Sequence, residues 1–181
     1  MWVTGWSLFL DRDGVLNRRI HDGYVCTVGQ LEVLDGVVDA VARLSAVAQR
    51  VVVVTNQAGV GKGLMTTTSL DEVHRVLIDR LTATGGRVDA VFACVHCADE
   101  GCDCRKPEPG LAWQARRRFP DIDVARSVMV GDSPSDVDFA RAAGMRAVFI
   151  GDPRDLVGRD VWLTVTDLAS AVPELLGLMT S

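Results

Sequence analysis

The sequence lacks long hydrophobic runs and has no excess of basic residues. No apolar segment approaches the roughly 18 residues that a membrane-spanning helix needs, so we expect no membrane partner. The opening stretch "MWVTGWSLFLDRD" lacks the basic segment and the small-residue cleavage site of a signal peptide, which predicts a cytoplasmic location. The net charge of −5 argues against a nucleic-acid partner, because clustered Lys and Arg residues bind phosphate backbones.

Internal repeats, low-complexity tracts and linker-like segments are also lacking. A chain of 181 residues with 48% hydrophobic content is long enough to bury one sizeable core, and nothing in its length requires a second one. We therefore expect a single domain over residues 1–181, acting as a monomer.

Apolar runs rich in β-branched residues alternate with segments of helical periodicity, and each run stops at polar residues or glycine. The predicted strands are residues 7–11, 51–55, 88–94, 127–132, 146–150 and 161–165. Continuous runs such as "VVVV" at residues 51–54 indicate strands that are buried on both faces.

Helices are predicted between these strands and after the last one. Apolar residues over 37–48 mark one helical face, and Ser69 with Glu72 predicts a capping box that opens a second helix. Pro109 suits the first turn of a third helix, Gly144 suits the end of a fourth, and a fifth is expected over residues 167–176. Strands that alternate with helices indicate right-handed crossovers, so we expect a doubly wound α/β fold with a parallel sheet.

Polar residues follow three of the predicted strands. Asp11 and Asp13 end the first strand, residues 55–57 (Thr-Asn-Gln) end the second, and Asp132 and Asp136 lie in "GDSPSD" at the end of the fourth. Ligands bind at the carboxyl ends of strands in an open parallel sheet, so these residues are expected to share one crevice.

Several carboxylates in one crevice repel one another unless a cation lies between them. Mg²⁺ prefers oxygen ligands, and it combines one or two carboxylates with phosphate oxygens of a substrate. Thr55 and Lys106 would supply a hydroxyl group and a positive charge for that phosphate. The pattern therefore predicts a Mg²⁺-dependent phosphoryl-transfer enzyme.

Four of the five cysteines lie in "CVHCADEGCDCRKP", residues 94–107. In a cytosolic chain such clustering indicates a metal site before it indicates disulfides. Cys94, His96, Cys102 and Cys104 form a possible tetrahedral zinc set without an open position, in a zinc loop over residues 94–104. A set with Cys97 in place of His96, and a loop of disulfides or bare thiols, are the alternatives.

Two further features resemble functional motifs but are not predicted to act as such, although the glycines of the first predict a flexible loop beside the phosphate. The run "NQAGVGKG" looks like a nucleotide-binding loop, but Asn56 stands at its first glycine position and Gly63 follows Lys62 where a Ser or Thr is needed. His74 falls in a predicted helix, where we favour an exposed position without a catalytic role.

Four segments in the order "LDRDGVLN", "VVTNQAG", "CRKPEPG" and "MVGDSPSDVDFA" span residues 10–140. Together they resemble the signature of the haloacid dehalogenase-like phosphohydrolases. The resemblance implies a Rossmann-like fold with a minimal cap, Asp11 as the nucleophile and Asp13 as the acid and base. It also implies that Asp11, Asp132 and the backbone carbonyl of Asp13 hold Mg²⁺, with Thr55 and Lys106 completing the catalytic set.

One branch of this family carries a C-x-H and C-x-C zinc loop directly before its R-K-P motif. It contains the D,D-heptose 1,7-bisphosphate phosphatases and the similar histidinol-phosphate phosphatases, and "GYV" at residues 23–25 looks more like the heptose enzymes. The resemblance implies removal of the 7-phosphate from a small sugar bisphosphate through an aspartyl-phosphate. Its implied substrate contacts are Gly23, Tyr24, Asn56, Gln57 and Arg105. Histidinol phosphate is the alternative substrate, and a non-catalytic zinc module that binds nucleic acid is the weaker third reading.

Overall fold

The computed structural model describes residues 5–181 and contains a parallel sheet of six strands in the order β3-β2-β1-β4-β5-β6. The first four residues of the opening stretch lie outside the described part of the chain. The strands are β1 (Ser7–Leu10), β2 (Val51–Asn56), β3 (Ala90–Cys94), β4 (Ser127–Gly131), β5 (Arg146–Ile150) and β6 (Leu163–Val165). The predicted doubly wound α/β fold is confirmed.

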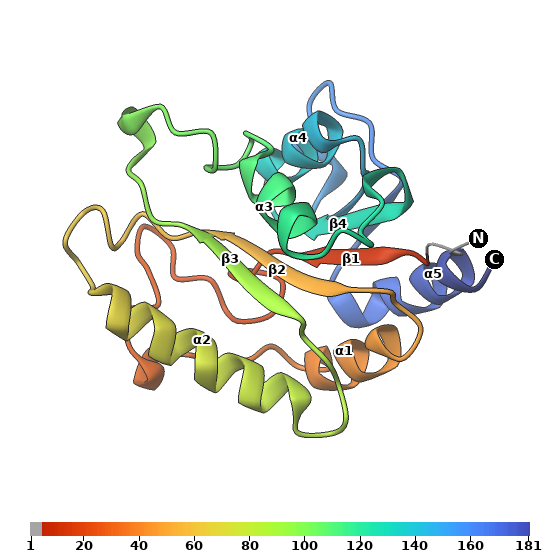
Figure 1. The fold of residues 1–181 in the computed structure, drawn as a ribbon, viewed down its shortest axis with the longest axis horizontal. Helices are drawn as coiled ribbons and strands as arrows, with labels where there is room; N and C mark the ends of the chain where they lie inside the picture. The colour runs from red at the N-terminus through yellow and green to blue at the C-terminus, as the bar shows by residue number, and fades with distance from the viewer. Residues whose placement is uncertain (1–4) are drawn as a thin grey trace.

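Helices cover both faces of the sheet (Figure 1). They are α1 (Val37–Ser45), α2 (Thr67–Thr82), α3 (Gly110–Arg118), α4 (Pro134–Ala143) and α5 (Leu168–Thr180). Leu8 and Val53 face the core shared with α1, α2 and α5, while Phe9 and Val52 face the core shared with α3 and α4. This alternation explains the apolar runs, because every second side chain enters the opposite core.

Several predicted boundaries differ from the structure. Both β1 and β4 end one residue early, so Asp11 and Asp132 lie just beyond their strands. The predicted capping box at residue 69 is wrong: α2 begins at Thr67, and the Thr66 side chain accepts a hydrogen bond from the Ser69 backbone N–H at 3.0 Å. Three threonines precede Ser69, and any of them can cap a helix. Helix α5 continues beyond residue 176 to Thr180.

The connections at the carboxyl edge of the sheet carry no large folded insert within the described chain. Residues 11–36 and 95–109, which follow β1 and β3, contain only the short 3-10 turns Val28–Gln30 and Ala98–Glu100. The remaining 3-10 turns are Val124–Arg126 and Pro153–Asp155. This agrees with the minimal cap that the family resemblance implies.

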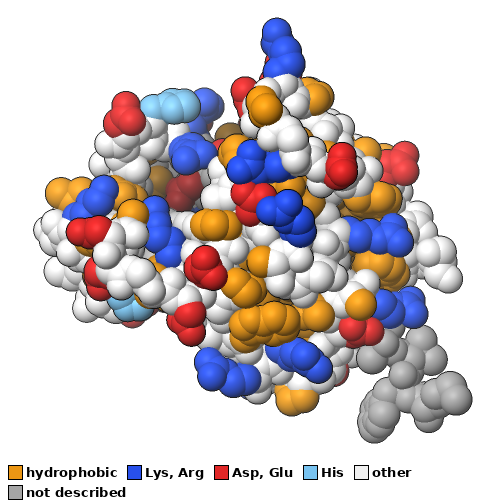
Figure 2. Space-filling model, turned by 90° about the horizontal axis from the view of Figure 1, so that it is seen from above, with side chains coloured by type: hydrophobic (Ala, Val, Ile, Leu, Met, Phe, Trp, Pro, Cys, Tyr) orange, Lys and Arg blue, Asp and Glu red, His pale blue; other side chains and the backbone are white. Residues whose placement is uncertain are grey.

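Charged and hydrophobic side chains are mixed on one face of this fold (Figure 2). Acidic and basic side chains are interspersed over the face seen in Figure 2, and hydrophobic side chains lie between them. Among residues 5–181, no helix has the length and apolar character needed to cross a bilayer.

Candidate active site

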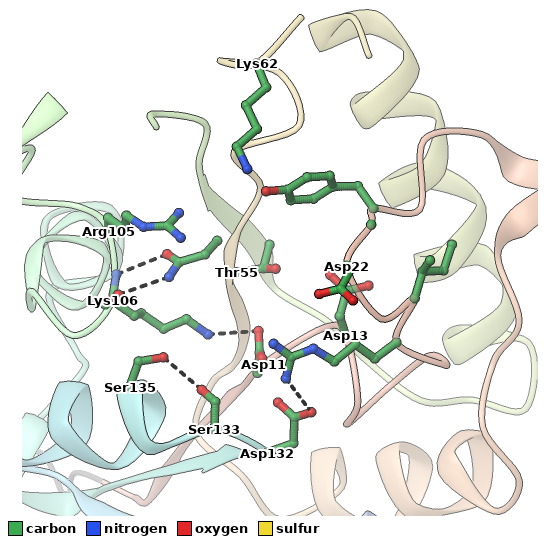
Figure 3. Close-up of a pocket in the computed structure, with 15 residues that line it drawn as sticks. Asp11, Asp13, Asp22, Thr55, Lys62, Arg105, Lys106, Asp132, Ser133 and Ser135 are labelled. Atoms are coloured by element: carbon green, nitrogen blue, oxygen red, sulfur yellow. Dashed lines mark hydrogen bonds and ion pairs between the residues drawn. The ribbon is translucent and has the colours of Figure 1, made fainter. Parts of the chain in front are cut away.

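A cavity of about 470 Å³ lies at the carboxyl ends of β1, β2 and β4 (Figure 3). Its lining includes nine residues that the sequence had indicated: Asp11, Asp13, Gly23, Tyr24, Thr55, Asn56, Arg105, Lys106 and Asp132. The structure therefore brings together side chains separated by more than a hundred positions. The parallel sheet explains this convergence, since its strand ends share one edge.

Lys106 lies at the base of the cavity between two carboxylates. Its Nζ lies 2.8 Å from Oδ1 of Asp11 and 2.6 Å from Oδ1 of Asp136, and it donates a hydrogen bond to the Val54 carbonyl at 3.0 Å. Although burial alone would lower the pKa of Lys106, Asp11 and Asp136 raise it above its usual value. Lys106 is therefore a permanently charged group in the floor of the site.

Asp11 is buried directly after β1. Burial raises its pKa to about 7 against the opposing effect of Lys106, and the nearby charges of Asp136 and Asp132 act in the same direction as burial. Its Oδ1 accepts a hydrogen bond from the backbone N–H of Arg12 at 2.8 Å. Oδ1 thus has two donors that fix the orientation of the carboxylate.

A sharp turn at Gly14 brings Asp13 back over the cavity. Gly14 has a φ of +89°, and a Cβ atom there would lie 2.0 Å from Oδ2 of Asp132. Only glycine fits this position, because a side chain would meet both a strained backbone and a neighbouring carboxylate. The turn is closed by the Gly14 N–H, which donates to the Asn17 carbonyl at 2.8 Å.

The Asp13 carboxylate is held by three side chains. Arg12 Nη2 donates to Asp13 Oδ2 at 2.9 Å, Asn17 Nδ2 donates to Oδ1 at 2.9 Å, and Gln57 Nε2 donates to Oδ2 at 2.7 Å. Gln57 is fully buried and also donates to Thr55 Oγ1 at 2.8 Å. The structure thus places Gln57 beneath the cavity wall. Arg12 was not indicated by any sequence motif.

Asp132 is suited to a cation. One oxygen of Asp132, Oδ1, is buried and has no hydrogen-bond partner among the described residues, and its carboxylate lies with those of Asp11 and Asp136 in one acidic group. Both oxygens of Asp136 are already used, by Lys106 and by Ser133. The free oxygen capacity therefore belongs to Asp11 and Asp132, which fits a hard divalent ion.

The upper part of the cavity carries two basic side chains, Lys62 and Arg105 (Figure 3). Arg105 Nη1 is buried without a hydrogen-bond partner among the described residues, and Lys62 Nζ lies 5.4 Å from the centre of the Tyr24 ring. Asn56 bonds through its amide to both the backbone N–H and the carbonyl of Lys106, at 3.0 and 3.1 Å. Lys62 belongs to the run "NQAGVGKG", whose residue spacing does not fit a nucleotide-binding loop. That spacing did not predict that the Lys62 side chain lines this cavity.

Arg19 also reaches the cavity from the connection after β1. Its Nη1 lies 3.1 Å from Oδ2 of Asp132. Burial raises the pKa of Asp132, and Arg19 opposes part of that effect. No motif in the sequence distinguishes Arg19 from its neighbour Arg18, which instead pairs with Glu32 on the surface.

The second group of predicted ligands gathers beside this cavity. Atoms of Cys94, His96, Cys102 and Cys104 lie within 4.8 Å of one another, and Cys97 is not part of that group in the described chain. Sγ–Sγ distances are 3.1 Å for Cys94–Cys104 and 3.6 Å for the other two pairs. Tetrahedral Zn–S bonds of about 2.3 Å separate sulfur atoms by about 3.7 Å. The three sulfurs and Nδ1 of His96 can therefore hold zinc.

Comparisons with known proteins all point to one family. The HAD-hydrolase-like family model matches residues 103–154. The D-glycero-alpha-D-manno-heptose-1,7-bisphosphate 7-phosphatase of Mycobacterium bovis is 45% identical over 135 residues, which cover 75% of this chain and 71% of that protein. The D-glycero-beta-D-manno-heptose-1,7-bisphosphate 7-phosphatase of Vibrio cholerae is 34% identical over 180 residues, covering 94% and 95%.

A solved structure is similar over almost the full chain. The D,D-heptose 1,7-bisphosphate phosphatase from Bordetella bronchiseptica, crystallised with magnesium and phosphate, gives a TM-score of 0.87 with 36% sequence identity. The match covers 95% of this chain and 98% of that one. The likeness therefore extends over nearly the full length of both chains.

Proposed function

Because the chain belongs to the haloacid dehalogenase-like phosphatases, in the branch of the heptose-1,7-bisphosphate 7-phosphatases, we propose that it removes the 7-phosphate of D-glycero-D-manno-heptose 1,7-bisphosphate. The observation that carries the proposal is the contact of Lys106 with Asp11, with Asp13 held two residues further on at the same cavity.

Asp11 acts as the nucleophile in this proposal. Its carboxylate oxygen forms a bond to phosphorus while the bond from phosphorus to the C7 oxygen breaks, and a proton from Asp13 passes to that leaving oxygen. Asp13, now a carboxylate, takes a proton from water as the water oxygen attacks the aspartyl-phosphate. The Asp11–phosphate bond then breaks, which releases phosphate and restores both side chains. Lys106 contributes a fixed positive charge, and the Thr55 hydroxyl lies on the same wall.

Asp11, Asp132 and the backbone carbonyl of Asp13 would hold Mg²⁺. The partnerless buried oxygen of Asp132 supports this assignment, because a carboxylate oxygen without a donor is costly to bury. When bound, Mg²⁺ neutralises carboxylate and phosphate charge and so reduces the repulsion between Asp11 and an anionic substrate.

Cys94, His96, Cys102 and Cys104 would hold a structural zinc ion. The chain passes from Cys104 directly into Arg105 and Lys106. Burial raises the pKa of the Cys94 and Cys104 thiols, so zinc would have to displace their protons on binding. Burial also acts to raise the pKa of Cys102, but hydrogen bonds from the Arg105 backbone and from neighbouring thiols lower it to about 7, which favours its thiolate. Zinc would therefore fix the backbone that presents both basic residues to the cavity.

The proposed distal contact is Arg105. A buried guanidinium nitrogen without a partner is expected to meet an anion or hydroxyl group of the substrate, and the guanidinium fork suits a second phosphate. Gly23, Tyr24 and Asn56 line the same space and would contact the sugar. Histidinol phosphate offers an amine and an imidazole at that end, which Arg105 would not stabilise.

A phosphate-release screen with Mg²⁺ tests this proposal. Both anomers of heptose 1,7-bisphosphate, a hexose bisphosphate and histidinol phosphate are compared, and we expect the highest kcat/KM with a heptose bisphosphate and heptose 1-phosphate as product. Arg105→Ala should lower kcat/KM by about tenfold or more for the bisphosphate and by less for a monophosphate. Arg117→Ala, an exposed arginine on α3, is the control. An equal or higher kcat/KM for histidinol phosphate, unaffected by Arg105→Ala, would contradict the proposal.

A further inference from the structure

A buried network lies behind the wall of the active site. The Arg12 side chain has no exposed surface, and its guanidinium joins helix α2 to the cavity. Nη1 lies 3.1 Å from Nε2 of His74, while Nη2 donates to Asp13 Oδ2 at 2.9 Å and to Gln57 Oε1 at 3.0 Å. His74 is itself buried, contrary to the exposed position expected from the sequence.

Arg12 is a costly residue to place here. A guanidinium removed from water requires an opposite charge, and within the described chain Asp13 is its one carboxylate partner. The Asp13 side chain is 23% exposed and lines the cavity, so the ion pair extends from the interior to the site of reaction. Arg12 therefore fixes the orientation of Asp13. A residue that holds Arg12 in place orients Asp13 indirectly, through this ion pair.

His74 is the residue that holds the far side of the guanidinium. Burial, followed by the positive charge of Arg12, lowers the pKa of His74 to about 4, so the ring is neutral in ordinary buffers. A neutral ring protonated on Nδ1 accepts the Nη1 hydrogen at Nε2. With Nη1 satisfied in this way, Nη2 is left to face Asp13 and Gln57.

Gln57, the first residue after β2, holds the same arrangement from the other side. Its Oε1 accepts from Arg12 Nη2 and its Nε2 donates to Asp13 Oδ2, so one amide bridges the two charged groups. All members of the network except Asp13 are buried. The network reaches the cavity at Thr55, which accepts from Gln57, and at Asp13, the residue that the proposed mechanism uses for proton transfer.

We propose that His74 is a positioning residue that acts through Arg12 to hold the Asp13 side chain where its protonated carboxyl group can pass a proton to the leaving oxygen. This inference rests on the proposed phosphatase function and deepens it. His74 touches neither substrate nor the reacting atoms, and it lies on a helix that contributes no residue to the lining of the cavity.

If His74 positions Asp13, the effect of removing it should depend on the leaving group of the substrate. An alkoxide is a poor leaving group that needs a proton, whereas a nitrophenolate leaves without one. The value of kcat/KM reports the steps up to departure of the leaving group, before hydrolysis of the aspartyl-phosphate. A mispositioned Asp13 should therefore reduce kcat/KM strongly for alkyl phosphates and weakly for aryl phosphates.

The experiment compares wild type and His74→Leu on a series of phosphate monoesters from 4-nitrophenyl phosphate to alkyl phosphates, with Mg²⁺ present. We expect kcat/KM to fall by about tenfold to a hundredfold for alkyl esters and by less than about twofold for 4-nitrophenyl phosphate. His74→Gln, whose amide oxygen can accept from Arg12, should recover most of the alkyl-ester activity. If His74→Leu does not fold, His74→Asn, which is too short to reach Nη1, takes its place.

Leu81→Ala is the matched control, because Leu81 is a fully buried residue two turns further along α2. It should lower the melting temperature and leave the dependence on the leaving group unchanged. An equal loss of kcat/KM for all esters in His74→Leu, or no recovery in His74→Gln, would overturn the positioning role. Heptose 1,7-bisphosphate, itself an alkyl phosphate, is included in the series. Wild type inactive on it and on every other ester would instead overturn the proposed function and the inference with it.

Discussion

Lys106 Nζ lies 2.8 Å from Oδ1 of Asp11, and both side chains are buried although 94 residues separate them in the chain. Neither charge could be buried alone, since an isolated ion in a protein interior costs several kcal/mol. The pair therefore exists only when β1 and the segment after β3 are both in place. Folding thus places the Asp11 carboxyl group against the positive charge of Lys106.

Asp11→Asn should abolish phosphate release and leave the fold intact. An amide nitrogen cannot attack phosphorus, so kcat is expected to fall by several orders of magnitude, while Lys106 keeps Asp136 as its partner. A phosphate-release assay with Mg²⁺ checks the loss of activity, and the far-UV circular dichroism spectrum checks that the fold is intact. Asp71→Asn, on the exposed side of α2, is the control. Near wild-type turnover by freshly purified Asp11→Asn, shown by mass spectrometry to be free of deamidation, would rule out the covalent mechanism.

Asp136→Asn should destabilise the protein. Asparagine can still accept the hydrogen bonds of Ser133, so the substitution removes chiefly the charge that faces Lys106. Loss of one partner of a buried ion pair is expected to lower the free energy of unfolding by about 3 kcal/mol. Urea denaturation measures this change. Asp138→Asn, which removes a more exposed carboxylate paired with Arg159, should cost less than about 1 kcal/mol, and equal losses would count against our account.

The sequence predicts the parts of this site that depend on strand order. Asp11, Thr55 and Asp132 stand at the ends of strands whose apolar runs are clear, and a parallel sheet brings these ends to one edge. The burial of His74 was not predictable in this way. It depends on which face of α2 meets the sheet, and on an arginine at residue 12 that no periodicity distinguishes from a surface residue.

For neighbouring polar residues, the sequence likewise does not predict which side chain lines the cavity and which is buried. Asn56 and Gln57 are adjacent and chemically alike, yet one lines the cavity and the other is fully buried beneath it. Successive side chains at the end of a strand point in opposite directions, so an error of one residue in the strand boundary exchanges their roles. Three-dimensional packing decides between them.

Cys102→Ser should lose zinc, and Cys97→Ser should keep it. Cys102 belongs to the group of four ligand atoms, whereas Cys97 lies outside it. Loss of zinc is expected to lower both the melting temperature and the activity, because the loop leads into Arg105 and Lys106. Metal analysis of protein purified without chelator provides the measurement. Zinc content well below one ion per wild-type chain, or zinc loss in Cys97→Ser, would show that the assigned ligand set is wrong.

Acid should destabilise the wild type more than a variant without the His74 ring. Because burial and Arg12 lower the pKa of His74 from 6.5 to about 4, the folded protein binds fewer protons than the unfolded chain between these values. The free energy of unfolding therefore falls as the pH falls from about 6.5 to about 4, by a limit of about 3 kcal/mol from this residue.

Urea denaturation of wild type and His74→Gln across this pH range isolates the contribution, because the other titrating groups act on both proteins alike. The difference between the two free energies of unfolding should change by about 2 to 3 kcal/mol in favour of His74→Gln as the pH falls. His21→Gln, which removes an exposed histidine, should follow the wild type. A constant difference between wild type and His74→Gln would mean that His74 titrates alike in the folded and unfolded states. The ring would then have to be accessible to water, and the contact with Arg12 that orients Asp13 could not persist.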